Sequence, residues 1–289
     1  MRTIFVLFIC LVLLITGCTE RITFTQKKVV PEYAIIENKD DVHSFTDTCI
    51  APYIYTKVIS LNQLPVKEKK EKFVEMLLPS ILMVQHELNQ KIERLEHIEG
   101  WLTQHQTYLE SDSIFLYQLF KQYHCSNIFE LKKRLKPHPA SIVLGQAALE
   151  SGWGSSRFFQ EGNNVFGIWS YNAGEDRIMA LQGRDSTKIY VRKYPSIEES
   201  VKDYFQTIAR VNAYKEFRDE RINTNETDEL IPLLHRYSEV GKVYTRKLRY
   251  LIKSNNLTRF DNYGINDNYL KEEILELAQF NKFTGKSIN

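Results

Sequence analysis

The stretch from Ala140 to Leu149 contains no charged side chain, and it constrains the fold more than any other segment. Pro137-His138-Pro139 precedes it and Gly152 follows it, as is typical of the two ends of a helix. A helix with a solvated face carries charged or polar residues on that face, so this composition predicts a helix buried on nearly all sides. Other helices must therefore surround it, and Glu150 is the first charge to leave the core.

Several other stretches repeat apolar residues at three- and four-residue steps, which predicts amphipathic helices. The expected ranges are 66–95, 112–123, 127–133, 197–208, 228–236 and 243–253. Pro79 should kink the first helix or split it in two, and Ser196 with Glu199 forms a capping box. Between residues 163 and 195, Gly, Asn and Asp interrupt short apolar runs, which indicates a small β element. The expected fold class is α+β, mostly helical and lysozyme-like, with this β element directly after the central helix.

Composition excludes some functions. The chain has 38 Lys and Arg against 36 Asp and Glu, a formal net charge of +2. A nucleic-acid-binding protein usually has a marked basic excess, so no nucleic-acid partner is expected. No Cys or His pair has the spacing of a zinc site, so no metal and no cofactor are expected.

The N-terminus has the features of an export signal. Met1-Arg2 precedes an apolar run from Ile4 to Ile15 that suits a signal peptide but is too short for a membrane-spanning helix. Ile15-Thr16-Gly17-Cys18 resembles a bacterial lipobox, which implies that Cys18 is lipidated and becomes the mature N-terminus. An ordinary signal peptide with an incidental cysteine is the alternative. By resemblance to Gram-negative lipoproteins, Thr19 after the cysteine favours anchoring in the outer membrane, on its periplasmic side.

These observations divide the chain into four parts. They are a signal peptide (1–17), a lipidated polar tether (18–60), a lysozyme-like domain (61–260) and a C-terminal helix or tail (261–289). Cys49 and Cys125 would remain besides Cys18 after export, and they could form a disulfide in an oxidising periplasm or stay free.

Glu150 is the main candidate for chemistry. Helical spacing places it on the same face as Gln146, at the end of an uncharged helix. Partial burial and the negative end of the helix dipole would both raise the pKa of Glu150. A carboxyl group that stays protonated near neutral pH can donate a proton to a glycosidic oxygen. Trp153 could form an apolar wall or stack on a sugar; alternatively, Glu150 merely ends a helix next to glycines.

Asn163 and Asn164 form the second candidate group. They precede Val165-Phe166-Gly167 and suit a turn into a strand, with side-chain amides free to bind the acetamido and hydroxyl groups of a sugar. Ordinary turn chemistry would explain the same residues without any ligand.

Five runs carry a family resemblance: E-S-G-W-G at 150–154, S-R-F at 156–158, N-N-V-F-G at 163–167, K-Y-P-S at 193–196, and L-H-R-Y-S-E-V-G-K-V-Y at 234–244. Over about residues 60–260 the chain resembles the glucosaminidases of glycoside hydrolase family 73, in particular the Bax-type proteins. The resemblance implies a lysozyme-like fold and cleavage of the β-1,4 bond between N-acetylglucosamine and N-acetylmuramic acid in peptidoglycan. The expected partners are therefore peptidoglycan glycan strands and, through Cys18, a membrane; the protein is expected to be a monomer.

The resemblance also implies roles for individual residues. Glu150 matches the general acid, and Tyr237 matches a cleft aromatic whose hydroxyl steadies the substrate or an attacking water. Asn164 and Phe166 match positions that line the cleft.

The second carboxylate stays open. Glycosidases generally use a pair, and the candidates here are Glu175, Asp176 and Asp185. A neighbouring-group route, in which the substrate's own 2-acetamido oxygen attacks C1, would need no second carboxylate.

Other functions compete with this hypothesis. A lytic transglycosylase also has Glu-Ser at the end of a core helix, but a Gly-Leu-Met-Gln run follows where this chain has N-N-V-F-G. An amide-cleaving peptidoglycan enzyme would need zinc ligands or a Cys-His pair, and the side chains of His124-Cys125 would diverge on a helix. A non-catalytic wall-binding lipoprotein is the alternative from another class.

Overall fold

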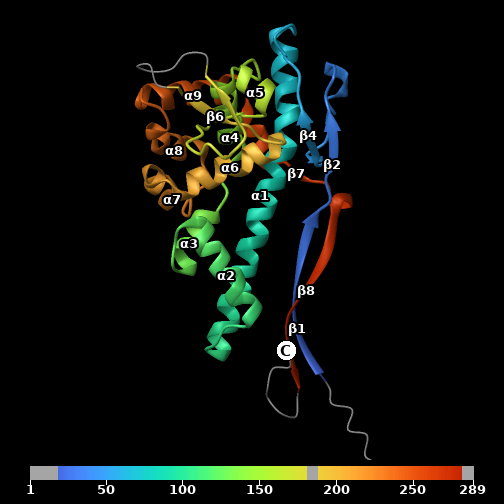
Figure 1. Ribbon diagram of the computed structural model, residues 1–289, viewed down its shortest axis with the longest axis vertical. Coiled ribbons are helices and arrows are strands. Elements are labelled where there is room, and N and C mark those ends of the chain that lie inside the picture. Colours follow the sequence, from blue (N-terminus) through green and yellow to red (C-terminus); the bar gives the residue numbers. More distant parts are fainter. Residues whose placement is uncertain (1–18, 181–187, 282–289) are drawn as a thin grey trace, which may run out of the picture.

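The uncharged segment forms helix α4 (Ala140–Ser151), and every side chain from Ala140 to Ala148 is buried. The structure is a computed structural model that describes residues 19–180 and 188–281. In it α4 lies in the middle of the helical body (Figure 1). Gly152 ends the helix with a φ of 60°, a left-handed conformation that glycine adopts at little cost. The signal segment, Cys18 and Asp185 lie outside the described residues.

The mostly helical fold class is confirmed. The other helices are α1 (Val66–His105), α2 (Glu110–Tyr123), α3 (Ile128–Leu135), α5 (Arg157–Gly162), α6 (Ile197–Arg210), α7 (Lys215–Glu220), α8 (Thr227–Leu230) and α9 (Lys242–Ser254). Three 3-10 turns bear on the site: η2 (Asn212–Tyr214), η3 (Ile231–Tyr237) and η4 (Leu257–Asn262). The predicted helix at 228–236 is therefore α8 continued by η3.

Helix α1 runs through Pro79 without interruption, so of the two expected outcomes, a kink or a split, the split does not occur. A proline inside a helix removes one hydrogen bond and crowds the preceding turn. Here Pro79 is buried, and α1 packs against α4 and α6 around it. Apolar packing of a long helix face outweighs one lost hydrogen bond.

The strands form four two-stranded sheets. β1 (Thr19–Val29) pairs antiparallel with β8 (Leu270–Asn281), β2 (Glu32–Ile35) pairs parallel with β4 (Tyr53–Lys57), and β3 (Cys49–Ile50) pairs parallel with β7 (Gly264–Ile265). β5 (Arg177–Met179) and β6 (Tyr190–Arg192) form an antiparallel hairpin. This last pair is the β element that the sequence predicts after α4.

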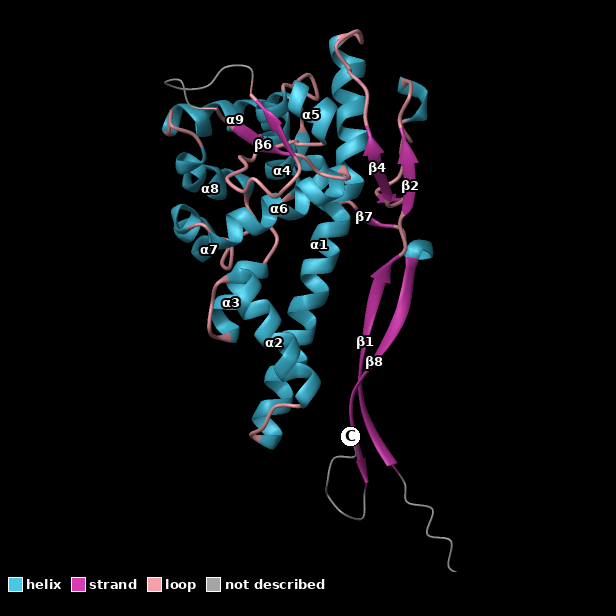
Figure 2. Ribbon diagram, viewed as in Figure 1, coloured by secondary structure: helices cyan, strands magenta, loops and turns pink. Residues whose placement is uncertain are grey.

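Within the expected tether (18–60) and the expected C-terminal helix or tail (261–289), residues 19–29 and 270–281 are instead strands, because β1 and β8 form one ribbon along the helical body (Figure 2). The alternation of Ile22 and Phe24 with polar residues is the signal for β1. The Glu- and Leu-rich sequence of β8 favours a helix by propensity, but strand pairing overrides a propensity of this size.

The β1–β8 ribbon is fixed to the helices by hydrogen bonds. The Lys27 N–H donates to Gln90 Oε1 over 2.7 Å, and the Lys27 carbonyl oxygen lies 2.6 Å from His86 Nε2, both on α1. On the other strand, Ser111 Oγ of α2 donates to the Leu277 carbonyl over 2.9 Å. Residues 19–29 are therefore part of the folded body.

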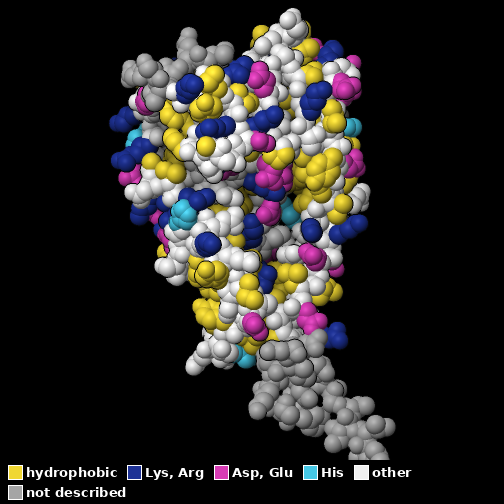
Figure 3. Space-filling view, in the orientation of Figure 1, with side chains coloured by type: hydrophobic (Ala, Val, Ile, Leu, Met, Phe, Trp, Pro, Cys, Tyr) yellow, Lys and Arg dark blue, Asp and Glu magenta, His cyan; other side chains and the backbone are white. Residues whose placement is uncertain are grey.

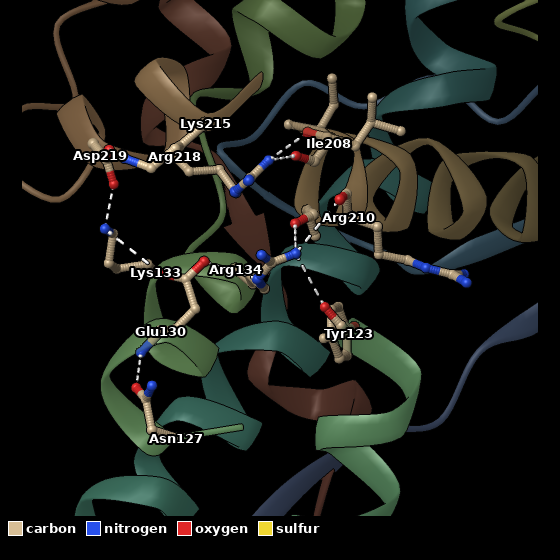
Figure 4. Close-up of polar contacts among 12 residues, drawn as sticks. Tyr123, Asn127, Glu130, Lys133, Arg134, Ile208, Arg210, Lys215, Arg218 and Asp219 are labelled. Carbon is tan, nitrogen blue, oxygen red and sulfur yellow. Dashed lines mark hydrogen bonds and ion pairs between the residues drawn. The ribbon is translucent and has the colours of Figure 1, made fainter. Parts of the chain in front are cut away.

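Arginine side chains complete the ends of several helices (Figure 4). Carbonyl groups in the last turn of a helix have no intrahelical donor. Arg134 donates to the carbonyl oxygens of Tyr123 at the end of α2 and Ala209 near the end of α6, over 3.1 and 2.9 Å. Arg218 donates to that of Ile208 over 2.9 Å. The two guanidinium groups thus join α2, α3, α6 and α7.

Arg221 does the same for α3, from a fully buried position. Its Nη2 donates to the carbonyl oxygens of Lys133 and Arg134 over 3.0 and 2.9 Å. Its Nη1 lies 3.2 Å from His138 Nδ1. Burial, and secondarily the charge of Arg221, hold the pKa of His138 well below its usual range.

We expect the free energy of unfolding to depend on His138 below about pH 6.5, the ordinary pKa of histidine. Below that pH the unfolded chain binds a proton at His138 and the native protein does not, so stability falls as the pH falls toward the folded pKa. The loss is at most about 1.4 kcal/mol per pH unit. Urea unfolding of the native protein and His138→Gln at several pH values measures it: the stability difference between them should change with this slope. A difference independent of pH between 7.5 and 5.5 would contradict the neutral histidine.

Gly145 allows α9 to approach α4 closely. A Cβ atom on Gly145 would lie 2.7 Å from Ile252 and 2.8 Å from Leu248. We expect Gly145→Val to lower the free energy of unfolding by about 2–3 kcal/mol, since extra volume in a packed core strains it. Gly100→Val in α1 is the matched control, because a Cβ there meets nothing within 4 Å. Chemical denaturation of both variants tests the packing, and equal stabilities would refute it.

Both cysteines of the described part are free: Cys49 is exposed at β3 and Cys125 is half-buried after α2. The possible disulfide is therefore not formed. Within residues 19–180 and 188–281, no helix combines the length and the apolar character needed to cross a membrane. Positive and negative side chains are interspersed over the face shown in Figure 3, in keeping with the small net charge.

Candidate functional site

Glu150 occupies the last turn of α4 and is exposed, unlike the residues before it. Burial of its carboxyl group among protein atoms nevertheless raises the pKa of Glu150, and a hydrogen bond from the Tyr244 hydroxyl counteracts part of the rise. The two observations agree if solvent reaches one side of the carboxyl group while its other side packs against the protein. A carboxyl group in this setting keeps its proton to higher pH and can still meet a substrate.

Three tyrosines interact electrostatically with Glu150, and we call Tyr214, Tyr237 and Tyr244 the tyrosine cluster. They come from η2, η3 and α9, which converge on the end of α4. The Tyr237 ring stacks on that of Tyr244 with centroids 5.4 Å apart and planes 18° apart, and it lies 6.1 Å from that of Tyr214. Burial, above all, holds the pKa of Tyr237 well above its usual range. Glu150 and Tyr237 are 87 positions apart in the sequence, but in the fold they are close enough for the charge of Glu150 to raise the pKa of Tyr237.

Gln146 connects this site to the core. It is fully buried, its Nε2 donates to the Tyr244 hydroxyl over 3.0 Å, and its Oε1 accepts from the Tyr204 hydroxyl over 2.6 Å. The sequence placed Gln146 on the face of Glu150 but assigned it no role, and Tyr204, Tyr214 and Tyr244 received none either. A lone amide in an otherwise apolar helix, one turn before the acid, is the signal that could have found it.

The sequence predicts that the amides of Asn163 and Asn164 are free to bind a sugar. In the structure both residues are buried and their amides are engaged within the protein. Asn163 Nδ2 donates to the carbonyl oxygens of Thr56 and Tyr194, each over 3.0 Å. Asn164 Nδ2 donates to two carbonyl oxygens over 2.8 and 3.0 Å, and its Oδ1 accepts from the Ile168 N–H. A buried amide is stable only when it is paired in this way, so both residues hold the loop between α5 and β5.

Phe166 also differs from its expected place in the cleft. It is buried, and its ring stacks on Tyr204 with centroids 4.2 Å apart and planes 19° apart. Phe166 therefore packs the core behind the site, against a residue that bonds to Gln146.

Trp153 is half-buried after α4 and turns toward α1. Its ring meets that of Phe73 edge-on at 5.6 Å, and Lys70 Nζ lies 5.1 Å from its centre. It borders a cavity of about 470 Å³ that also includes Asn255 and Arg259. The expected apolar wall or stacking face thus belongs to a cavity between α1 and η4.

Of the carboxylates that the sequence predicts in the β element, Glu175 and Asp176 are described, and neither affects the pKa of Glu150. Glu175 forms an ion pair with Arg192 over 3.5 Å, and Arg192 also pairs with Asp203 of α6 over 2.6 Å. Glu175 and Asp176 line a cavity of about 310 Å³ with these residues. Burial and the Tyr244 hydrogen bond are the two influences on the pKa of Glu150, so no described carboxylate shifts it. Among the residues described, no group of three or more His, Cys, Asp or Glu side chains could hold a metal ion.

The segment that contains this site is similar to known proteins. Residues 125–257 match the family model Glucosaminidase, described as mannosyl-glycoprotein endo-beta-N-acetylglucosaminidase. The chain is 31% identical over 131 residues to Protein bax of Escherichia coli (strain K12), covering 43% of this chain and 46% of that protein. It is 29% identical over 150 residues to an N-acetylmuramoyl-L-alanine amidase domain-containing protein of Staphylococcus aureus (strain NCTC 8325 / PS 47), covering 44% and 22%. The chain thus spans less than half the length of these curated relatives.

Two solved structures are similar over about half of the chain. The catalytic domain of the autolysin Auto from Listeria monocytogenes is 25% identical, with a TM-score of 0.38 over 57% of this chain and 96% of that one. The glycoside hydrolase domain of Salmonella typhimurium FlgJ is 23% identical, with a TM-score of 0.34 over 52% and 91%. The segment that matches the family model contains Glu150, Gln146 and the whole tyrosine cluster. Residues 125–257 of this chain, a little under half of its length, are thus similar to the glucosaminidase family.

Proposed function

We propose that the protein is a peptidoglycan hydrolase that cleaves the β-1,4 bond after N-acetylglucosamine, with Glu150 as the general acid. The observation that carries the proposal is the raised pKa of an accessible carboxyl group, Glu150, inside the family-matched segment.

The chemistry requires a proton on the leaving oxygen. Protonated Glu150 gives its proton to the glycosidic oxygen as the bond to C1 breaks, and the carboxylate that forms accepts the hydrogen bond of Tyr244. The Tyr237 hydroxyl is proposed to steady the substrate or the attacking water. Trp153 is kept as a proposed sugar-stacking residue, since its ring borders a cavity.

The neighbouring-group route suits this geometry better than a second carboxylate. In that route the 2-acetamido oxygen of the substrate attacks C1, and the Glu150 carboxylate later takes a proton from the water that opens the cyclic intermediate. Glu175 is held by Arg192, and its charge does not affect the pKa of Glu150. Glu175 and Asp176 line a separate cavity with Arg192, which makes them the second choice for a base.

The location is proposed from the N-terminal sequence. Cys18 in its lipobox-like run would carry the lipid and hold the protein, as a monomer, on the periplasmic side of the cell envelope, in the outer membrane. Two or more acyl chains give stable anchoring. Labelling of growing cells with a radioactive fatty acid tests this, because Cys18→Ser should abolish the label.

Zymography tests the activity. A gel that contains purified peptidoglycan should show a cleared band at the position of the protein. A folded protein that binds peptidoglycan but leaves no cleared band would favour the wall-binding alternative over an enzyme.

A further inference from the structure

A chain of hydrogen bonds runs through the core to the tyrosine that faces Glu150. We call it the Arg221 relay, and its members are all buried: Arg221, His138, Tyr204, Gln146 and Tyr244. The successive distances are 3.2 Å (Nη1 to Nδ1), 2.8 Å (Nε2 to Oη), 2.6 Å (Oη to Oε1) and 3.0 Å (Nε2 to Oη). The relay begins at Arg221 after α7 and passes through His138, which directly precedes α4, and Tyr204 of α6. It continues through Gln146 of α4 and ends at Tyr244 of α9, so it spans the helical body.

The first members fix the direction of the relay. A guanidinium group has donors but no acceptor, so Arg221 must donate and His138 Nδ1 must accept. The single ring proton is then on Nε2 and is donated to the Tyr204 hydroxyl oxygen. The lowered pKa of His138 agrees with this neutral form.

The remaining members pass the same direction on. Tyr204 already accepts from the ring of His138, so it gives its own proton to Gln146 Oε1. The Gln146 amide therefore presents Nε2 to Tyr244, whose oxygen accepts. A tyrosine hydroxyl has one proton, and that of Tyr244 is left for Glu150.

We propose that the Arg221 relay aims the hydroxyl proton of Tyr244 at the carboxyl group of Glu150, so that Gln146 and Tyr204 act as positioning residues for the acid. Its catalytic consequence rests on the proposed function, but the relay itself does not. A fixed donor orients the carboxyl group and stabilises the carboxylate that remains after proton transfer. The hydrogen bond thereby lowers the pKa of Glu150, whereas burial raises it. The other titratable groups that face Glu150, Tyr214 and Tyr237, are outside the relay.

The test is a measurement of the pKa of Glu150 in the free protein, which needs no activity. Carbon-13-labelled glutamate gives carboxyl signals that shift with pH, and Glu150→Gln identifies the signal of Glu150. Tyr244→Phe removes the donor and should raise the pKa of Glu150 by about one unit. Tyr204→Phe removes the hydroxyl proton that holds Gln146 Oε1 in place. The Gln146 amide can then turn its oxygen toward Tyr244 and accept the Tyr244 hydroxyl proton that otherwise bonds to Glu150. We expect a smaller rise in the same direction.

Tyr123→Phe is the matched control. Tyr123 is buried in α2, and no hydrogen bond of its hydroxyl group is found among the described residues. It should leave the pKa of Glu150 unchanged. A rise in Tyr244→Phe alone would show a local contact without a relay, and no rise in either variant would overturn the contact as well.

In an active enzyme, the alkaline limb of the kcat/KM profile should move with the pKa of Glu150, whereas a merely structural defect would scale the rate equally at every pH. Lack of activity in the native protein would refute the proposed function only.

Discussion

Replacing Glu150 by glutamine is expected to lower the rate of peptidoglycan cleavage at least about 100-fold and to leave the fold intact. Loss of a general acid typically costs about two to four orders of magnitude. Glutamine has the shape of a protonated glutamic acid and can accept the Tyr244 hydrogen bond, but it has no proton to give to a leaving oxygen. The measurement is the release of soluble fragments from purified peptidoglycan under initial-rate conditions, with thermal unfolding followed in parallel.

Glu229→Gln is the control for this substitution. Glu229 is exposed on α8, within the family-matched segment, and is not a member of the tyrosine cluster. It should retain the rate of the native protein. An unchanged rate in Glu150→Gln would remove Glu150 from the reaction, and an equal loss in both variants would point to a general effect on the protein.

The second large effect is expected on stability. Arg221→Met should lower the free energy of unfolding by roughly 3–5 kcal/mol, because it leaves one buried and two partly buried acceptors without their donor. These are the carbonyl oxygens of Lys133 and Arg134 and the Nδ1 of His138. Methionine fills similar space, so the loss reports mainly on the missing hydrogen bonds. Urea unfolding measures it, as a lower midpoint with an unchanged slope.

Arg246→Met is its control, since Arg246 is exposed on α9. A change within about 0.5 kcal/mol is expected there. Equal stabilities of the two variants would mean that the hydrogen bonds of Arg221 to the end of α3 and to His138 add nothing to the fold.

The central helix and its acid could be predicted from the sequence because they depend on local composition. Ala140 to Leu149 has no charge, and burial of that segment follows wherever the rest of the chain lies. The mostly helical class and the hairpin near residues 177–192 follow from periodicity and turn residues in the same way.

The ribbon of β1 and β8 could not be predicted from local patterns. Its paired residues are about 240 to 260 positions apart, and β8 has the composition of a helix. Long-range pairing decides such a segment, and a single sequence does not show it.

The asparagines show the same limit within the site. Two adjacent amides next to a glycine can bind a sugar or hold a turn, and only their partners distinguish these uses. In the fold the Asn163 amide donates hydrogen bonds to the carbonyl oxygens of Thr56 and Tyr194, which come from distant segments. Conversely, Gln146 has a polar role because Tyr204 and Tyr244 meet it from α6 and α9.

The bond that is cleaved is the most direct test of the proposed function. Purified peptidoglycan digested with the native protein is reduced with borohydride, and the soluble fragments are analysed by mass spectrometry. The account predicts fragments that end in reduced N-acetylglucosamine and that are absent from the Glu150→Gln digest. Fragments that end in anhydromuramic acid, or in reduced N-acetylmuramic acid, would show cleavage of the other linkage and contradict it.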